Sequence, residues 1–231
     1  MSHEDKITFC TTGMLRPGIL EKTYSSFSKN LTGIDLKKCH LILNIDPLPA
    51  KNNNDKKKKS ITNIANKYFG KVEINWSKKA NHTNAVKTVW SKVTTPYIFH
   101  LQDDWELKKK VNINDMMKVM EDDDKIHEVM LMRKCNKCPN RVGFPPCLLS
   151  EKFFKGLPEL FNSNMACEYQ MQRIFAGDPK FPKHPSGLDH SCLMFFPSKK
   201  TPVIIDIGRA WMKKSGYVRG KHDKFITWRR N

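Results

Sequence analysis

Two adjacent carboxylates follow an apolar, strand-like run in the middle of the sequence. Residues 96–101 read Pro-Tyr-Ile-Phe-His-Leu and lead directly into Gln102, Asp103 and Asp104. Two carboxylates at the end of a buried strand are costly unless a cation or hydrogen-bond donors meet them. Oxygen ligands of this type suit Mg²⁺ or Mn²⁺, which commonly bridge one or two carboxylates to substrate phosphates. The pair alone is equally compatible with a structural role, in which it caps the strand or contacts nearby lysines.

Other polar residues also follow apolar runs. A β-rich run at 7–11 leads into Thr11 and Thr12, and the apolar run at 40–45 is closed by Asp46. Ligands of open α/β sheets bind at the carboxyl ends of the strands. We therefore expect these residues and the Asp103–Asp104 pair to meet at one edge of a sheet.

The elements that would position these residues alternate along the chain. Apolar patterns predict strands at 7–11, 40–45, 72–76, 96–101, 129–132 and 203–207. Helical spacing predicts helices that begin near 16–18 and cover 61–68, 84–93, 112–122 and 164–175. The Lys/Asn-rich residues 51–59 and the Pro- and Cys-rich residues 135–147 are expected to be loops. The alternation predicts an α/β fold with a mostly parallel central sheet flanked by helices, in a single domain.

Composition excludes several classes of protein. The chain has 231 residues and is 39% hydrophobic, enough for a real core, so disorder is not expected. It has no run of about 18 apolar residues, so no ordinary transmembrane segment is expected. The N-terminus is charged and lacks the long apolar stretch of a secretory signal. We therefore expect a cytoplasmic protein.

The net charge of +18 indicates an anionic partner or simply a Lys-rich composition. A basic nucleic-acid-binding protein is one alternative, but the sequence contains no RNP-type motif and no complete zinc finger. A metal-dependent nucleotidyl or phosphoryl transferase is another. It would also need strand-end carboxylates, but no GxxxxGK[ST] loop is present.

The seven cysteines are unevenly spaced, which favours free thiols in a cytosolic chain. Cys135 and Cys138 form a CxxC pair, and Cys147 follows nine residues later. Such a pair can be half of a structural zinc site, which Cys167 or a histidine would complete. The usual second CxxC or HxxxH is missing, so this zinc site is a minor alternative.

Four stretches together resemble the GT-A fold glycosyltransferases, in the neighbourhood of the large family of inverting synthases (family 2-like). Residues 7–17 look like the first strand and nucleotide loop of that family, and 43–46 look like its second strand. Residues 81–86 with 97–105 are similar to the helix and strand that lead into its metal-binding Asp-x-Asp. Residues 206–211 with 225–228 are similar to a C-terminal signature of a subset of these enzymes. The Lys/Asn-rich composition is also similar to that of small soluble glycosyltransferases of large DNA viruses.

The resemblance implies a nucleotide-sugar donor, with UDP favoured, and a Mn²⁺ or Mg²⁺ ion. It implies a nucleotide-sugar-binding half at 1–107 and an acceptor-binding half at 108–231. Asp104 is the implied metal ligand, because Gln102 stands where the family often has an acidic residue. His190 is a candidate for a further metal or phosphate ligand. The implied donor-binding residues lie at the strand ends and in the flanking loops: Thr11, Thr12, Arg16, Asp46, Asn81, Asn84, Asp103 and Arg209.

The resemblance also implies the chemistry. An inverting transfer needs a general base that takes the proton of the acceptor hydroxyl. Glu168 is the expected base, since related enzymes place an acidic residue at the start of a helix that faces the acceptor. Asp189 is the reserve candidate. The positive end of the helix dipole is a competing structural reason for Glu168. The acceptor is expected to be a glycan or a protein-linked glycan, and retaining chemistry stays open.

Overall fold

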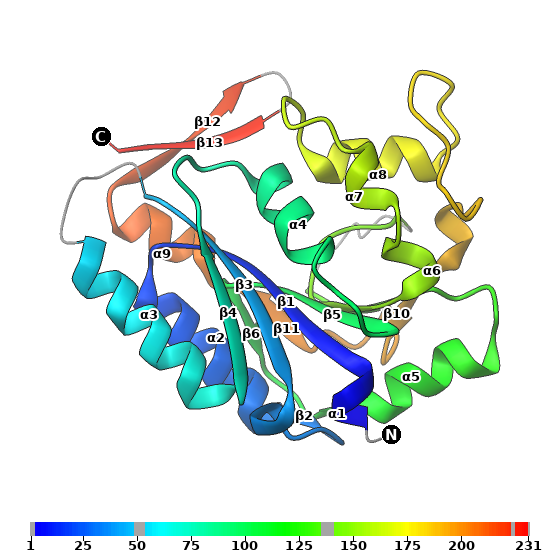
Figure 1. Cartoon of the computed structure of the whole chain (residues 1–231), viewed down its shortest axis with the longest axis horizontal. Helices are drawn as coiled ribbons and strands as arrows, with labels where there is room; N and C mark the ends of the chain where they lie inside the picture. Colours follow the sequence, from blue (N-terminus) through cyan, green and yellow to red (C-terminus); the bar gives the residue numbers. More distant parts are fainter. Residues whose placement is uncertain (1–2, 49–53, 135–140, 223–224, 231) are drawn as a thin grey trace.

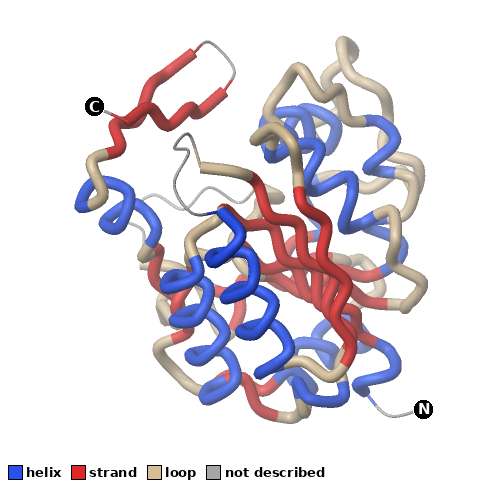
Figure 2. The backbone as a smooth tube through the Cα atoms, turned by 60° about the vertical axis from the view of Figure 1, so that its left-hand side comes forward, coloured by secondary structure: helices blue, strands red, loops and turns tan. Residues whose placement is uncertain are grey.

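The computed structural model describes residues 3–48, 54–134, 141–222 and 225–230. A seven-stranded sheet forms the middle layer, and helices cover both of its faces (Figures 1 and 2). The strands of this sheet are β1 (Ile7–Met14), β3 (His40–Asp46), β4 (Lys71–Trp76), β5 (Tyr97–Gln102), β8 (Glu128–Leu131), β9 (Cys147–Ser150) and β10 (Leu193–Phe196). Their order across the sheet is β10-β8-β9-β5-β1-β3-β4.

Most neighbouring strands of the sheet are parallel. Strand β1 lies between β3 and β5 and runs parallel to both, and β4 extends the same parallel block. Strand β9 is antiparallel to both of its neighbours, β5 and β8. Parallel strands are buried on both faces, which explains the near-continuous apolar run of β3.

Alternate residues of the central strands feed two separate cores, as the two-residue repeat of a strand requires. Ile7 and Phe9 pack in one buried cluster with side chains of α2 (Pro17–Asn30), α3 (Asn54–Tyr68) and α5 (Ile113–Asp122). Cys10 and Ile42 pack in a second cluster. Its helices are α4 (His82–Trp90), α6 (Glu151–Phe154), α7 (Leu157–Leu160) and α8 (Cys167–Phe175).

Smaller elements complete the described structure. Near the N-terminal half these are α1 (His3–Lys6), β2 (Leu31–Thr32), η1 (Leu36–Lys38) and β7 (Val111–Asn112). The second half adds η2 (His190–Cys192), α9 (Gly208–Lys214), β12 (Tyr217–His222) and β13 (Phe225–Arg230). A separate short ribbon pairs β6 (Trp105–Leu107) with β11 (Ile204–Asp206) in antiparallel fashion. Among the described helices, none is long and apolar enough to span a bilayer.

The predicted fold class is confirmed: the sheet is mixed, mostly parallel and flanked by helices. The predicted strands at 7–11, 40–45, 72–76, 96–101, 129–132 and 203–207 all have counterparts within a few residues. The five described cysteines are free and buried. The division into a donor half and an acceptor half stays a prediction.

Several local predictions were wrong. Residues 54–59, expected in a loop, form the first turns of α3, because lysine is a good helix former and its charge stays at the surface. Helix α4 begins at His82 rather than at 84, because Asn81 caps it by accepting a hydrogen bond from the amide of Asn84. Strand β9 and helix α9 were not predicted.

Candidate active site

Parallel pairing brings three strand ends together. In the register of the sheet, Met14 of β1 lies opposite Asp46 of β3, and Thr12 lies opposite Gln102 of β5. The residues that follow these positions therefore gather at one edge. The sequence predicted this convergence for the Asp103–Asp104 pair and Asp46, and the structure confirms it.

Arg16 binds both carboxylates of the pair. Its Nε donates to Oδ2 of Asp103 at 2.9 Å, and its Nη2 donates to Oδ1 of the same residue at 2.6 Å. The same Nη2 donates to Oδ2 of Asp104 at 2.9 Å. The backbone amide of Met14 also donates to Oδ2 of Asp103, at 3.0 Å. The guanidinium therefore bridges the pair through charge-assisted hydrogen bonds, which are the strong kind.

Close backbone packing fixes this cluster. A Cβ atom at Gly13 would lie 2.7 Å from Cβ of Asp103, and one at Gly208 would lie 2.1 Å from Oδ2 of Asp104. Thr23 of α2 donates to the backbone carbonyl of Asp103 at 2.6 Å. Gly208 arrives at this place because β11 pairs with β6, which directly follows Asp104. Only glycine permits such approaches of the backbone.

The two carboxylates of the pair differ in exposure. The side chain of Asp103 is 3% exposed and that of Asp104 is 24% exposed. Burial raises the pKa of Asp104 to about 6, the charge of Asp103 adds to this rise, and Arg16 opposes it. Burial alone would lower the pKa of Arg16, but the two carboxylates raise it. Arg16 thus stays charged, and Asp104 is the member of the pair that a ligand can reach.

A second polar cluster lies at the end of β3. Asp46 accepts hydrogen bonds from the backbone amide of Asn81 at 2.9 Å and from the Nδ2 of Asn44 at 3.0 Å. Asn81 in turn donates through Nδ2 to the carbonyl of Ser163, 2.9 Å away. Asn84 accepts from the hydroxyl of Ser163. Asp46, Asn81 and Asn84 are therefore brought together, with α4 held against the loop before α8.

The structure separates the two threonines of β1. Thr11 is fully buried between β3 and β5, which speaks against direct contact between its side chain and a ligand. Thr12 is also buried, at 3% exposed, but its hydroxyl lies 3.4 Å from Nε2 of His82 at the strand-end edge. Asp103 was expected to contact a sugar or ribose. Its two oxygens accept three protein hydrogen bonds, two of them from Arg16, so Asp103 holds Arg16 in place, and its contact with the donor stays a prediction.

Glu168 stands in the first turn of α8, as predicted, with its side chain exposed to solvent. Surrounding protein nevertheless raises the pKa of its carboxyl, and the charges of Arg133 and Arg209 oppose this rise. Arg209 also pairs with Asp206, with its Nε 3.0 Å from Oδ2, and its side chain is 67% exposed. The charge of Glu168 therefore lies within electrostatic range of Arg209.

His190 and Asp189 do not join this group among the described contacts. The Nδ1 of His190 lies 3.3 Å from the amide of Val142, and its Nε2 lies 3.1 Å from the carbonyl of Gln172. Both ring nitrogens of His190 therefore already have hydrogen-bond partners. Asp189 caps η2 by accepting from the amide of Ser191, which lowers the pKa of its carboxyl and makes it a weaker base.

Whether a metal ion fits this site depends on the side chains that could act as its ligands. No group of three or more His, Cys, Asp or Glu side chains suited to a metal occurs among the described residues. Asp104 offers one partly exposed carboxylate. Such a ligand fits Mg²⁺ or Mn²⁺ when phosphates of a substrate supply further oxygens. The proposed zinc pair, Cys135 and Cys138, lies outside the described residues.

Sequence reasoning missed three residues at the edge. His82 begins α4 and contacts the ends of both β1 and β5. Thr23 donates to the Asp103 carbonyl, and the charge of Arg133 acts on the carboxyl of Glu168. Of these three, only His82 lies in a stretch that carries the family resemblance. It is therefore the only one of the three that the sequence could have indicated as a site residue.

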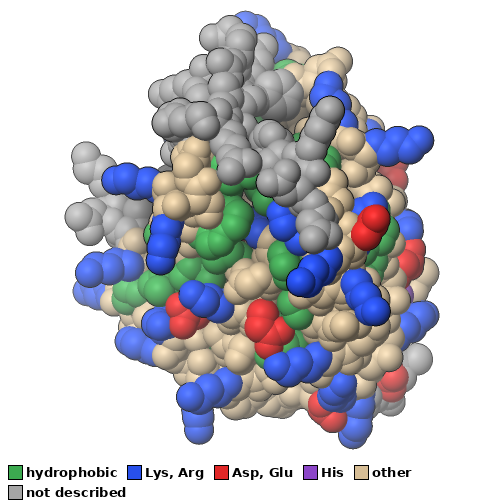
Figure 3. Space-filling view, turned by 90° about the vertical axis from the view of Figure 1, so that its left-hand side faces the viewer, with side chains coloured by type: hydrophobic (Ala, Val, Ile, Leu, Met, Phe, Trp, Pro, Cys, Tyr) green, Lys and Arg blue, Asp and Glu red, His purple; other side chains and the backbone are tan. Residues whose placement is uncertain are grey.

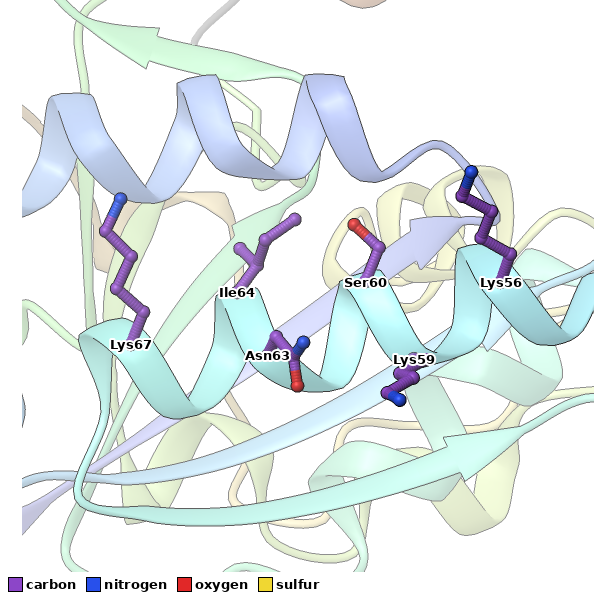
Figure 4. Close-up of a pocket in the computed structure, with 6 residues that line it drawn as sticks. All are labelled: Lys56, Lys59, Ser60, Asn63, Ile64 and Lys67. Atoms are coloured by element: carbon purple, nitrogen blue, oxygen red, sulfur yellow. The ribbon is translucent and has the colours of Figure 1, made fainter.

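Two further features lie on the surface, and the first shares no side chain with the site described above. A hollow of about 350 Å³ runs along one side of α3 and is lined by Lys56, Lys59, Ser60, Asn63, Ile64 and Lys67 (Figure 4). It contains no carboxylate, and Lys67 is paired with Glu21. On the face shown in Figure 3, Lys and Arg side chains are scattered among green and red ones and do not merge into one basic patch.

Sequence comparisons find no matching family model and no matching curated protein. Solved structures do match. A mannosyltransferase, PcManGT from Pyrobaculum calidifontis in complex with GDP-Man and Mn²⁺, has a TM-score of 0.55 at 7% identity, over 91% of this chain and 61% of that one.

S. aureus TarS 1–349 in complex with UDP has a TM-score of 0.54 at 8% identity, over 72% of this chain and 54% of that one. The longer S. aureus TarS chain has a TM-score of 0.51 at 8% identity, and the match covers 32% of it. The chain thus spans between about a third and three fifths of the lengths of these structures. These similarities show that the chain has a GT-A-like fold.

Proposed function

We propose that this chain is a glycosyltransferase that moves a hexosyl or pentosyl group from a nucleotide-diphosphate sugar, with UDP favoured, to a glycan or protein-linked glycan. The observation that carries the proposal is the Arg16–Asp103–Asp104 cluster at the carboxyl end of β5. Open α/β sheets bind their ligands at this edge. The GT-A-like fold supports the same reading, as do neighbours solved with UDP or with GDP-Man and Mn²⁺.

The donor would lie across the ends of β1, β3 and β5. Asp46, Asn81 and Asn84 surround the end of β3, where polar groups can bind the base or ribose. Breaking the bond to the sugar develops negative charge on the diphosphate, so cations must stabilise it. Arg209 is suited to this role, because its side chain is largely exposed and has only one described carboxylate partner.

Asp104 would hold the divalent ion, together with the diphosphate. When bound, Mn²⁺ or Mg²⁺ neutralises charge on the departing diphosphate. Arg16 keeps the Asp103 carboxylate occupied, so Asp104 remains the accessible ligand of the pair. Gly208 lets the backbone pack directly against the Asp104 carboxylate, where a Cβ atom would lie 2.1 Å from Oδ2.

Glu168 would be the general base of an inverting transfer. Its carboxylate would take the proton of the acceptor hydroxyl as the hydroxyl oxygen bonds to the anomeric carbon and the bond to the diphosphate breaks. A raised pKa makes Glu168 a stronger base than an ordinary glutamate, and Arg133 and Arg209 help to keep it ionised. The exposed position at the start of α8 is open to an incoming acceptor.

Thermal unfolding with a panel of UDP-, GDP- and CMP-sugars, with and without Mn²⁺, tests the donor. We expect a stabilising shift from one nucleotide class that grows when Mn²⁺ is present. Asp104→Ala should abolish the Mn²⁺-dependent part, whereas the exposed control Asp122→Ala should keep it. The absence of any shift from every nucleotide sugar, with or without Mn²⁺, would refute the proposal.

Turnover of the best donor with glycan acceptors tests the base. Glu168→Gln should lower kcat by about 10²–10⁴-fold while the affinity for the donor stays unchanged. Glu159→Gln, an exposed glutamate of α7, is the matched control and should be silent. Near-normal turnover in Glu168→Gln would remove this residue from the mechanism without affecting the donor assignment.

A further inference from the structure

One imidazole joins three parts of the strand-end edge. His82, the first residue of α4, has its Nε2 3.4 Å from the hydroxyl of Thr12 and 3.4 Å from Nε2 of Gln102. Its Nδ1 lies 3.5 Å from Sγ of Cys167. The ring also packs edge-on against Phe144, at 5.5 Å between centroids. His82 thus contacts the ends of β1 and β5 and the start of α8.

These polar contacts are long. Hydrogen bonds of nitrogen to oxygen are usually 2.7–3.2 Å between heavy atoms, so neither ring nitrogen has a strong partner among the described residues. The side chain is nevertheless exposed to solvent. An accessible imidazole that is fixed by packing but weakly satisfied has hydrogen-bonding capacity to offer a ligand.

The ring of His82 contacts residues that stand next to both proposed functional groups, the Asp103–Asp104 pair and Glu168. Gln102 directly precedes the Asp103–Asp104 pair, and Cys167 directly precedes Glu168. The departing diphosphate would be held on the Asp104 side, and the acceptor hydroxyl on the Glu168 side. The sugar that moves between them must then lie beside His82.

The protonation state of the ring suits a neutral ligand. Desolvation by the surrounding protein lowers the pKa of His82 to about 4, although the charge of Asp103 opposes this shift. At neutral pH the ring is uncharged, with one nitrogen that donates and one that accepts. A sugar hydroxyl can both donate and accept, whereas a phosphate would favour a charged partner.

We propose that His82 binds a hydroxyl of the transferred sugar and so contributes to donor specificity. This inference rests on the proposed glycosyltransferase function and assigns a role within that same site. His82 acts by binding, so its removal should affect the sugar portion of the donor and leave the nucleotide portion unaffected.

The test compares nucleotide with nucleotide sugar. Equilibrium dissociation constants are measured for UDP and GDP and for UDP-glucose, UDP-N-acetylglucosamine and GDP-mannose, all with Mn²⁺. His82→Ala should weaken the nucleotide sugar that the wild type binds best by about two- to ten-fold, as expected for one or two lost hydrogen bonds. The matching free nucleotide should bind as before. His82→Asn, which keeps a donor and an acceptor, should restore part of the loss.

The control variant is His127→Ala, which removes an imidazole that contacts Ser150 instead. It should leave the ratio of the two dissociation constants unchanged. Equal weakening of nucleotide and nucleotide sugar in His82→Ala, or no change in either, would overturn this inference and leave the proposed function standing. Failure of the wild type to bind any nucleotide or nucleotide sugar would overturn both.

Discussion

Replacing Arg16 by methionine should strongly destabilise the fold, whatever the protein binds. The change removes all three hydrogen bonds of the guanidinium and leaves Asp103, 3% exposed, beside Asp104. Removing one partner of a buried ion pair typically costs about 3–5 kcal/mol, because an uncompensated charge stays buried. Thr23 and the Met14 amide remain in place, so the loss is assigned to the charge.

Urea unfolding, followed by far-UV circular dichroism, measures this cost. The matched control is Arg209→Met, which breaks an exposed pair with Asp206 and should cost within about 1 kcal/mol. A second variant, Arg16→Met with Asp103→Asn, removes the unpaired charge as well. It should recover part of the loss, and the double-mutant cycle gives the coupling between the two residues.

The pH dependence supplies an independent check. Burial raises the pKa of Asp104 and Arg16 opposes this rise, so without Arg16 the folded-state pKa of Asp104 should rise further above its unfolded value. The folded state then binds more protons than the unfolded state, so stability falls as pH rises through that range. The deficit of Arg16→Met should therefore be smaller at pH 5 than at pH 8. A deficit under 1 kcal/mol, or one independent of pH, would refute the reasoning.

Three further predictions concern glycine packing, a buried acid and the base. Gly208→Ala should destabilise the protein by about 1–3 kcal/mol in urea unfolding, because the added Cβ meets Asp104, whereas Gly18→Ala has open space and should be nearly neutral. Burial raises the pKa of Glu128. The carboxyl therefore contributes favourably to folding stability at low pH, and this contribution is lost as pH rises above the ordinary glutamate range. Glu128→Gln should therefore raise the thermal midpoint at pH 8 more than at pH 4; an equal change at both would contradict this. The kcat/KM of the transfer should rise with pH through a pKa above that of an ordinary glutamate, as Glu168 ionises, and a flat profile from pH 4 to 8 would exclude it as the base.

Local patterns predicted the parts of the fold that local physics controls. The strands at 7–11 and 40–45 carry apolar residues that must be buried, so their place in the sheet follows from the sequence. The burial of Thr11 could also have been predicted. It shares the two-residue repeat of Ile7 and Phe9, which places it on the face toward α2.

Long-range pairings were beyond such patterns. Arg16 was expected to contact the donor, yet its described hydrogen bonds join it to carboxylates that follow a distant strand. Strand β11 has only three residues, too few to identify its partner from periodicity. His82 is the one histidine of α4 and belongs to no local motif. Its role depends on neighbours from β1, β5 and α8 that only the fold brings together.

The pairing of β11 with β6 has a consequence for the order in which the protein folds. Strands β1, β3, β4 and β5 are contiguous both in sequence and in the sheet, so they can associate early during synthesis. The segment that carries Gly208 and Arg209 emerges from the ribosome much later and closes against Asp104 only when β11 has docked. Loop closure over this separation favours late formation. The edge is therefore finished among the last steps, and binding of a donor should report a fully folded chain rather than a partly folded intermediate.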